Sequence, residues 1–114
     1  MLRQKYRASR LNIEDAIKSG LTVSESSLYA KVSRKDGDMP GFAIVVSKKI
    51  EKTSVGRHRI KRKISGALEA NMAKMSPSFK RTIVFFPKKT EKPVLYENVR
   101  KDLEEILKKS RFYV

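Results

Sequence analysis

The sequence predicts a single small α+β domain in which helices pack a central sheet. The predicted order is helix, two or three strands, helix, strand, helix, or α-β-β(-β)-α-β-α. With 114 residues, the chain has the length of about one ordinary domain with one modest core. Apolar runs at 42–46 and 82–87 have the length of buried strands. Segments with apolar residues at helical spacing precede, separate and follow these two runs.

The first predicted helix spans residues 10–20, and Gly20 provides a natural stop. Residues 1–9 are basic and contain no acid, so we expect a flexible N-terminal arm followed by one domain over residues 10–114. The residues that recur at roughly helical spacing are Leu11, Ile13, Ala16 and Ile17.

A strand and a turn are expected next. Residues 21–35 alternate only loosely, which suits a strand that begins with a weak or bulged portion. Turn dipeptides follow within residues 36–41, so the apolar run at 42–46 is predicted to form the second arm of an antiparallel hairpin. Because this run is apolar without alternation, we expect it to be covered on both faces and central in the sheet.

The second half of the chain predicts a helix, a strand and a last helix. Thr53 or Ser54 signals a helix start, and the helix is expected to run to about Met75. A second buried strand is predicted at 81–87, and apolar residues on one face predict a helix within 98–112. The apolar stripe of the middle helix comprises Ile60, Ile64, Ala67 and Leu68, and Phe42, Phe85 and Phe86 are assigned to the core.

The composition favours a polyanionic partner. The chain has 27 Lys and Arg against 12 Asp and Glu, a formal charge of +15. No apolar run approaches the length needed to cross a bilayer, and there is no cysteine for a disulfide or a thiolate metal site. A nucleic acid, a membrane surface or an acidic protein is therefore the expected class of partner, and a cytosolic setting is the default.

Nearly half of this charge lies in one segment. Residues 47–63 contain eight Lys or Arg and one Glu, a net charge of +7. At 100° per residue, Ile60 and Ile64 fall on the buried stripe, and cations cover most of the remaining circumference. Arg binds phosphate bidentately, Lys supplies a point charge, and a helix N-terminus offers free N–H groups. This segment is therefore a predicted phosphate-binding surface, on which Ser65 is expected to face outward.

Two simpler interpretations of the basic segment stay open. It could be a solvated basic helix face or a run of the nuclear-localisation type. A membrane-surface helix fits less well because the exposed face carries no Trp, Phe or Leu.

The sequence contains no recognisable catalytic constellation. No Ser, His and Asp set is discernible, and the single histidine, His58, cannot form a multi-histidine metal site. Asp36 and Asp38 could hold a hydrated Mg²⁺, but turn formation and solvation explain both residues. We expect no catalytic group and no metal site in the protein itself.

The stretch "GFAIVVSKKIEKTSVGRHRIKRKISGAL" resembles the signature of the bacterial ribonuclease P protein component. That family has an apolar strand ending in V-S-K-K, then a short linker and R-N-R-x-K-R-x-x-R-E. This chain differs at three motif positions, with His58 for Asn, Ser65 for Arg and Gly66 for Glu. The matching residues are Val46, Ser47, Lys48 and Lys49 in the first element and Arg57, Arg59, Lys61 and Arg62 in the second.

The resemblance implies a ribonucleoprotein endoribonuclease that removes the 5′ leader of precursor tRNA. The RNA subunit would hold Mg²⁺ and perform the cleavage, and this chain would be a non-catalytic, cytoplasmic subunit with no obligate protein partner and no membrane partner. It also implies a left-handed βαβ crossover, in a fold shared with the second domain of a small-subunit ribosomal protein.

Two groups of site residues are carried over by this resemblance. Ile13 and Ile17 occupy two positions that are aromatic in the family, and they can cover a base or ribose but cannot stack like a ring. His58 is expected to hydrogen-bond RNA in place of the Asn. The implied contacts to the catalytic RNA are Ser47, Lys48, Lys49, Arg57, His58, Arg59, Lys61 and Arg62, and those lining a cleft for the leader are Ile13, Ile17 and Tyr29.

Tyr29 itself is equally consistent with a core residue and with a stacking platform. Two further functions also remain open for the whole chain. One is a structural protein that binds ribosomal RNA and has no role in cleavage. The other is a DNA-binding regulator, although the basic helix carries few Asn or Gln side chains that could read bases.

Overall fold

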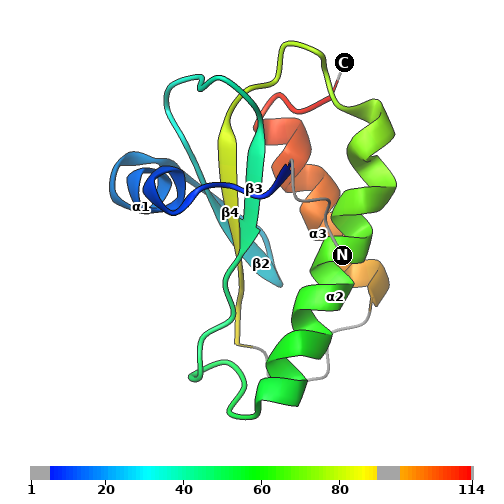
Figure 1. Cartoon of the computed structure of the whole chain (residues 1–114). Helices are drawn as coiled ribbons and strands as arrows, with labels where there is room; N and C mark the ends of the chain where they lie inside the picture. Colours follow the sequence, from blue (N-terminus) through cyan, green and yellow to red (C-terminus); the bar gives the residue numbers. More distant parts are fainter. Residues whose placement is uncertain (1–5, 90–95, 114) are drawn as a thin grey trace.

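The computed structural model describes residues 6–89 and 96–113 and contains one four-stranded sheet with helices on both faces (Figure 1). The strand order is β1-β2-β4-β3. The β1/β2 and β2/β4 pairs are antiparallel, and β3 pairs with β4 in parallel. The strands are β1 (Leu21–Ser24), β2 (Leu28–Val32), β3 (Gly41–Ile44) and β4 (Thr82–Pro87).

The helices form one layer on each side of the sheet. Helix α1 (Arg10–Ser19) lies on one face, and α2 (Ser54–Asn71) and α3 (Tyr96–Lys109) lie on the other (Figure 1). A single turn of 3-10 helix (Met72–Lys74) extends α2. These three helices and β4 confirm the sequence predictions.

Local signals explain where α1 begins and ends. Ser9 Oγ accepts a hydrogen bond from Asn12 N at 3.2 Å, which caps the start of the helix. Gly20 N donates to Ala16 O at 2.9 Å at its end. A Cβ on Gly20 would lie 2.2 Å from Ala16 O and 2.7 Å from Val32 O, so only glycine lets α1 approach β2 this closely.

Side-chain alternation divides the sheet into a core face and an outer face. On β2, Leu28, Ala30 and Val32 are buried, whereas Tyr29 and Lys31 are half-buried on the opposite side. The core lies between the sheet and helices α2 and α3. Its members are Leu28, Ala30, Val32, Phe42, Ile64, Ala67, Leu68, Phe79, Ile83, Phe85, Val99, Leu103, Ile106, Leu107 and Phe112.

The predicted position of β3 is wrong. Instead of forming a hairpin with β2 at the centre of the sheet, β3 lies at an edge and pairs with β4. The connection after β2 runs along the start of β4, because Ser33 N donates to Thr82 O at 2.9 Å and Gly37 N donates to Lys80 O at 2.8 Å. These bonds place β4 between β2 and β3.

Residues 6–9 of the predicted arm lie along the outer edge of β3. Arg7 forms a parallel bridge with Phe42, and Ala8 N donates to Phe42 O at 3.0 Å. Tyr6 packs against the core. The remainder of the predicted arm, residues 1–5, lies outside the described residues.

Strands β3 and β4 are parallel neighbours joined through α2, so they form a βαβ unit. The left-handed sense of this crossover, which the family resemblance implies, stays a prediction. The segment predicted as one strand with a weak start forms two strands, β1 and β2, which pair as a hairpin. Together with β3 they make three strands before α2, the larger of the two predicted numbers.

Candidate nucleic-acid interface

The first turn of α2 is capped by the protein's own groups. Thr53 Oγ1 accepts from Gly56 N at 3.0 Å, and Glu51 Oε1 accepts from Thr53 N at 3.2 Å and from Thr53 Oγ1 at 3.1 Å. These hydrogen bonds, led by the one from the Thr53 backbone, lower the pKa of Glu51. A Cβ on Gly56 would lie 2.5 Å from the Glu51 side chain, so glycine lets the carboxylate sit there. The N–H groups of Thr53 and Gly56 are therefore paired within the protein, and a contribution of the other N–H groups of this turn to phosphate binding stays a prediction.

Arg57 fixes the loop before α2. Its Nη1 donates to Glu51 O at 3.2 Å and to Lys52 O at 2.8 Å, and its side chain is half-buried. Ser47 O accepts from Ile50 N at 3.1 Å and from Glu51 N at 3.2 Å, which closes a turn in the same loop. The loop is thus held against the helix it precedes.

The other basic residues of α2 divide as the helical projection predicts. Ile64 is buried and Ile60 is half-buried, so the two isoleucines attach the helix to the core. The loop after β3 and the first turns of α2 lie at the same end of the molecule (Figure 1). We define the cationic surface as the exposed residues Ser47, Lys48, Lys49, His58, Arg59 and Arg62.

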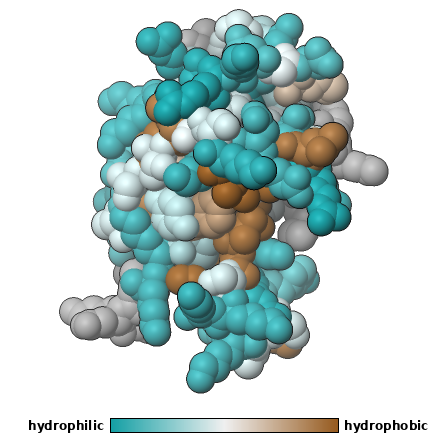
Figure 2. Space-filling view, turned by 90° about the vertical axis from the view of Figure 1, so that its left-hand side faces the viewer, coloured by the Kyte–Doolittle hydropathy of each residue, from teal (hydrophilic) through white to brown (hydrophobic). Residues whose placement is uncertain are grey.

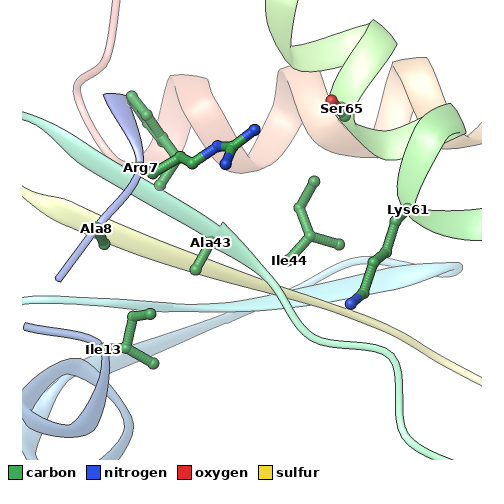
Figure 3. Close-up of a pocket in the computed structure, with 8 residues that line it drawn as sticks. Arg7, Ala8, Ile13, Ala43, Ile44, Lys61 and Ser65 are labelled. Carbon is green, nitrogen blue, oxygen red and sulfur yellow. The ribbon is translucent and has the colours of Figure 1, made fainter. Parts of the chain in front are cut away.

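Two other residues of α2 are less exposed than the cationic surface, and one of them departs from the helical projection. Ser65, expected to face outward, is only 3% exposed, and Lys61 is half-buried. Both line a cavity of about 280 Å³ that also involves Arg7 and the edge of β3 (Figure 3). The buried arc of α2 is therefore wider than its apolar stripe, on the side of the helix that faces β3.

The outer face of the sheet carries an aromatic pair. Tyr29 and Phe86 are opposite each other in β2 and β4, with ring centroids 4.9 Å apart and planes 8° apart. Val84, two residues before Phe86, is buried on the face that α1 covers, whereas Phe86 is half-buried. The assignment of Phe86 to the core is wrong, because strand alternation places it opposite Phe85.

This pair lines a hollow of about 420 Å³, which we call the aromatic hollow. Figure 2 shows the face on the α1 side, where apolar surface is bordered by hydrophilic residues. Lys88 and Lys89 supply cations to the hollow, and Ser47 and Ile50 connect it to the loop before α2. Its lining residues are Tyr29, Val45, Ser47, Ile50, Phe86, Pro87, Lys88 and Lys89.

The three residues implied for a leader cleft are not all in this hollow. Tyr29 lines it, but Ile13 lines the cavity beside β3, and Ile17 is 42% exposed on α1. Sequence reasoning missed Phe86 and Lys88 as site residues. Alternation along β4, together with the basic pair directly after it, is the signal that would have found them.

The described residues offer neither a metal-binding cluster nor a membrane-spanning helix. Over 6–89 and 96–113, no group of three or more His, Asp or Glu side chains could hold a metal ion. Asp36 lies 3.7 Å from Arg81 Nε, so this turn carboxylate has a cationic partner. In the same ranges no helix is both long and apolar enough to cross a membrane.

Comparisons with known proteins identify the family. The family model described as ribonuclease P matches residues 2–111 of this chain. A ribonuclease P protein from Staphylococcus aureus superposes with a TM-score of 0.76 at 20% identity, covering 99% of this chain and 95% of that one. The ribonuclease P protein from Thermotoga maritima gives 0.75 at 20% identity, with coverages of 95% and 98%. A search of curated proteins found no match. Because the family model spans nearly the whole sequence, this chain belongs to the ribonuclease P protein family.

Proposed function

We propose that this chain is the non-catalytic protein subunit of ribonuclease P, which assists removal of the 5′ leader from precursor tRNA in the cytoplasm. One observation supports this assignment most directly. The loop after β3 contributes Ser47 and Ile50 to the aromatic hollow and continues through Lys48 and Lys49 into α2. A single RNA-binding face therefore joins a platform for bases to a surface for phosphates.

The two parts of this face suit two different RNA segments. The cationic surface presents Arg59 and Arg62 from one helix, which fits the phosphate backbone of a folded RNA such as the catalytic subunit. The aromatic hollow presents Tyr29 and Phe86 with Lys88 beside them, which fits a single strand whose bases stack on aromatic rings. The precursor leader is such a strand.

The proposed mechanism is electrostatic and positional. Two RNAs repel each other through their phosphates, and a protein with a charge of +15 that contacts both lowers this repulsion. Mg²⁺ would be held by the RNA subunit, where it would activate the attacking water. Protein cations and metal ions screen the same phosphates, so the protein should reduce the concentration of Mg²⁺ that the reaction needs.

The decisive experiment measures leader removal by the RNA subunit at low and high Mg²⁺, with and without the purified protein. We expect the protein to accelerate the reaction at low Mg²⁺ and to have a smaller effect at high Mg²⁺. No acceleration at any Mg²⁺ concentration would overturn the proposal. Binding to ribosomal RNA without any such acceleration would instead support the structural RNA-binding function.

The aromatic hollow predicts a dependence on the leader. Phe86→Ala removes one of two stacked rings, and base stacking on an aromatic side chain contributes about 1–3 kcal/mol. We therefore expect precursor tRNA with a leader to bind the assembled enzyme roughly 5- to 150-fold more weakly, whereas mature tRNA binds unchanged. Met39→Ala, at an apolar residue 56% exposed and outside the hollow, is the matched control. Equal losses for both tRNAs would place Phe86 outside the leader contact.

A further inference from the structure

The turn that follows β3 presents two lysines of the cationic surface. Ser47 O accepts from Ile50 N at 3.1 Å and from Glu51 N at 3.2 Å, and these hydrogen bonds close the turn. Lys48 and Lys49 are its two central residues, and both are exposed. The positions of the two lysines on the surface therefore depend on how the far end of the turn is held.

Glu51 holds that far end against the start of α2. Its Oε1 accepts from Thr53 N at 3.2 Å and from Thr53 Oγ1 at 3.1 Å, and Thr53 Oγ1 in turn accepts from Gly56 N at 3.0 Å. Arg57 adds a second link, because its Nη1 donates to Glu51 O at 3.2 Å and to Lys52 O at 2.8 Å. The side chain and the backbone of Glu51 are thus both bound at the helix start.

The charge of Glu51 is the opposite of what a segment that binds a polyanion needs. It is the one acid among residues 47–63, which also contain eight Lys or Arg. A carboxylate beside exposed lysines lowers the local positive potential and weakens the attraction for phosphates. A Cβ on Gly56 would lie 2.5 Å from the Glu51 side chain, so the glycine makes room for this acid. Its hydrogen bonds, and not its charge, explain why an acid occupies the position.

We propose that Glu51 is a positioning residue, which does not touch RNA itself and holds Lys48 and Lys49 in the turn from which they contact phosphates of the bound RNA. That these lysines contact RNA rests on the proposed function above. A loop without these bonds would have to be ordered when RNA binds, and ordering costs conformational entropy. The bonds of Glu51 order the turn in the free protein, so this entropy is lost on folding and not on binding.

Two variants of Glu51 separate geometry from charge. Glu51→Ala removes the negative charge and the acceptor together, whereas Glu51→Gln removes the charge but keeps an amide oxygen that can accept from Thr53. Charge alone predicts that both variants bind the catalytic RNA equally, and more tightly than the native protein. We expect instead that Glu51→Ala binds about three- to tenfold more weakly, as for residues coupled in one hydrogen-bond network, and that Glu51→Gln binds at least as tightly as the native protein. Filter binding at one fixed salt concentration measures both.

A background without the two lysines tests whether Glu51 acts through them. In protein that carries both Lys48→Ala and Lys49→Ala, adding Glu51→Ala should weaken binding by less than about twofold, because coupled residues are not additive. A general loss of stability in α2 would behave differently. Its effect would persist in this background, because Arg59 and Arg62 remain exposed on that helix.

Asp38→Ala is the matched control for charge. Asp38 is exposed and precedes β3, whereas Glu51 follows it, so the two acids lie beyond opposite ends of that strand. Removing Asp38 should not weaken RNA binding.

A second measurement needs no RNA. The heteronuclear NOE of the Lys48 and Lys49 backbone amides reports motion on the picosecond-to-nanosecond timescale. It should fall in Glu51→Ala and stay close to the native value in Glu51→Gln.

Four results would overturn the proposal: tighter RNA binding by Glu51→Ala than by the native protein, equal affinities of the two Glu51 variants, a loss that persists in full without the lysines, or an unchanged NOE in Glu51→Ala. Failure here is distinguishable from failure of the proposed function. If the native protein accelerates leader removal at low Mg²⁺ but these results are found, the subunit function stands and the positioning role fails. If RNA binding depends on Glu51 as expected but leader removal is not accelerated, the positioning role stands and the subunit function fails.

Discussion

Two equally buried serines differ in whether the hydroxyl has a hydrogen-bond partner. Ser65 and Ser110 are both 3% exposed. Ser110 Oγ donates to Ile106 O at 2.7 Å, whereas Ser65 Oγ has no partner. The hydroxyl of Ser110 therefore stabilises the fold, and the unpaired hydroxyl of Ser65 costs stability.

Replacing each serine with alanine should change stability in opposite directions. Ser65→Ala removes an unpaired buried group and improves helix propensity, so we expect the free energy of unfolding to rise by about 1 kcal/mol or more. Ser110→Ala removes a satisfied hydrogen bond and should lower it by about 1 kcal/mol. Urea unfolding followed by circular dichroism measures both changes. A loss of stability in Ser65→Ala would show that the hydroxyl has an unrecognised partner.

The sequence predicts residues on α2 better than residues on the sheet. Ile60 and Ile64 were correctly placed toward the core, because helical periodicity is a local property. Ser65 was misplaced because its burial depends on tertiary packing beyond α2, where it lines a cavity with residues of β3 and the N-terminal segment. Phe86 was misplaced because an apolar run does not show which of its side chains a helix will cover.

At the scale of elements, a single carboxylate joins the β1–β2 hairpin to α3. Asp102 Oδ2 accepts from Ser26 Oγ at 3.0 Å, from Ser27 N at 2.8 Å and from Ser27 Oγ. These bonds connect positions that are about 75 residues apart in sequence. The hairpin turn is therefore fixed by a tertiary contact as well as by its own backbone.

Asp102→Ala should lower the free energy of unfolding by about 1.5–3 kcal/mol, because it removes hydrogen bonds to a charged group and leaves the turn donors unpaired. Asp36→Ala removes the same charge from a pair with Arg81 at 3.7 Å in which the Asp36 side chain is 66% exposed. That control should cost less than about 1 kcal/mol. Thermal unfolding of both variants distinguishes the two contributions, and equal losses would mean that only net charge matters.

The order of the strands illustrates what an isolated sequence does not determine. Caps at Ser9 and Thr53 lie next to the helices they begin, so both helix starts were predictable. The partner of β3 depends on hydrogen bonds from Ser33 and Gly37 to the start of β4, across more than 40 residues. Strand existence follows from local composition, but strand pairing follows from such long-range contacts.

The C-terminal segment adds a pH-dependent contact to α2. Tyr113 OH donates to Asn71 Oδ1 at 2.8 Å, and the Asn71 Nδ2 group donates to Ala67 O at 2.9 Å. Burial, and then the nearby charges of Glu104 and Glu105, raise the pKa of Tyr113 from 10.0 to about 12. The folded protein therefore holds this proton more tightly than the unfolded chain.

A raised pKa in the folded state contributes stability that is fully present below the unfolded value and is lost as pH rises. For Tyr113 this loss falls between pH 10 and about pH 12. We expect the urea midpoint of the native protein to fall more steeply over this range than that of Tyr113→Phe, which keeps the ring but cannot ionise. Parallel slopes for the two proteins would remove Tyr113 from the alkaline transition.

For the whole molecule, the distribution of charge matters more than its total. A net charge of +15 attracts any polyanion, but only side chains that touch phosphates release counterions from an RNA. Arg59 and Arg62 are exposed on the cationic surface, whereas Arg100 and Lys108 are exposed on α3, outside that surface. The two pairs have the same formal charge, so they separate direct contact from general attraction.

Binding of the catalytic RNA should therefore respond differently to two double variants. Replacing Arg59 and Arg62 with alanine should weaken binding and flatten the plot of log affinity against log salt, by roughly 0.7–0.9 in slope for each lost phosphate contact. Replacing Arg100 and Lys108 with alanine should leave the slope nearly unchanged. Filter binding over a series of salt concentrations measures both. An unchanged slope in the first variant would remove these two arginines from the interface, and an equal change in both variants would mean that the RNA responds to net charge without a defined binding surface.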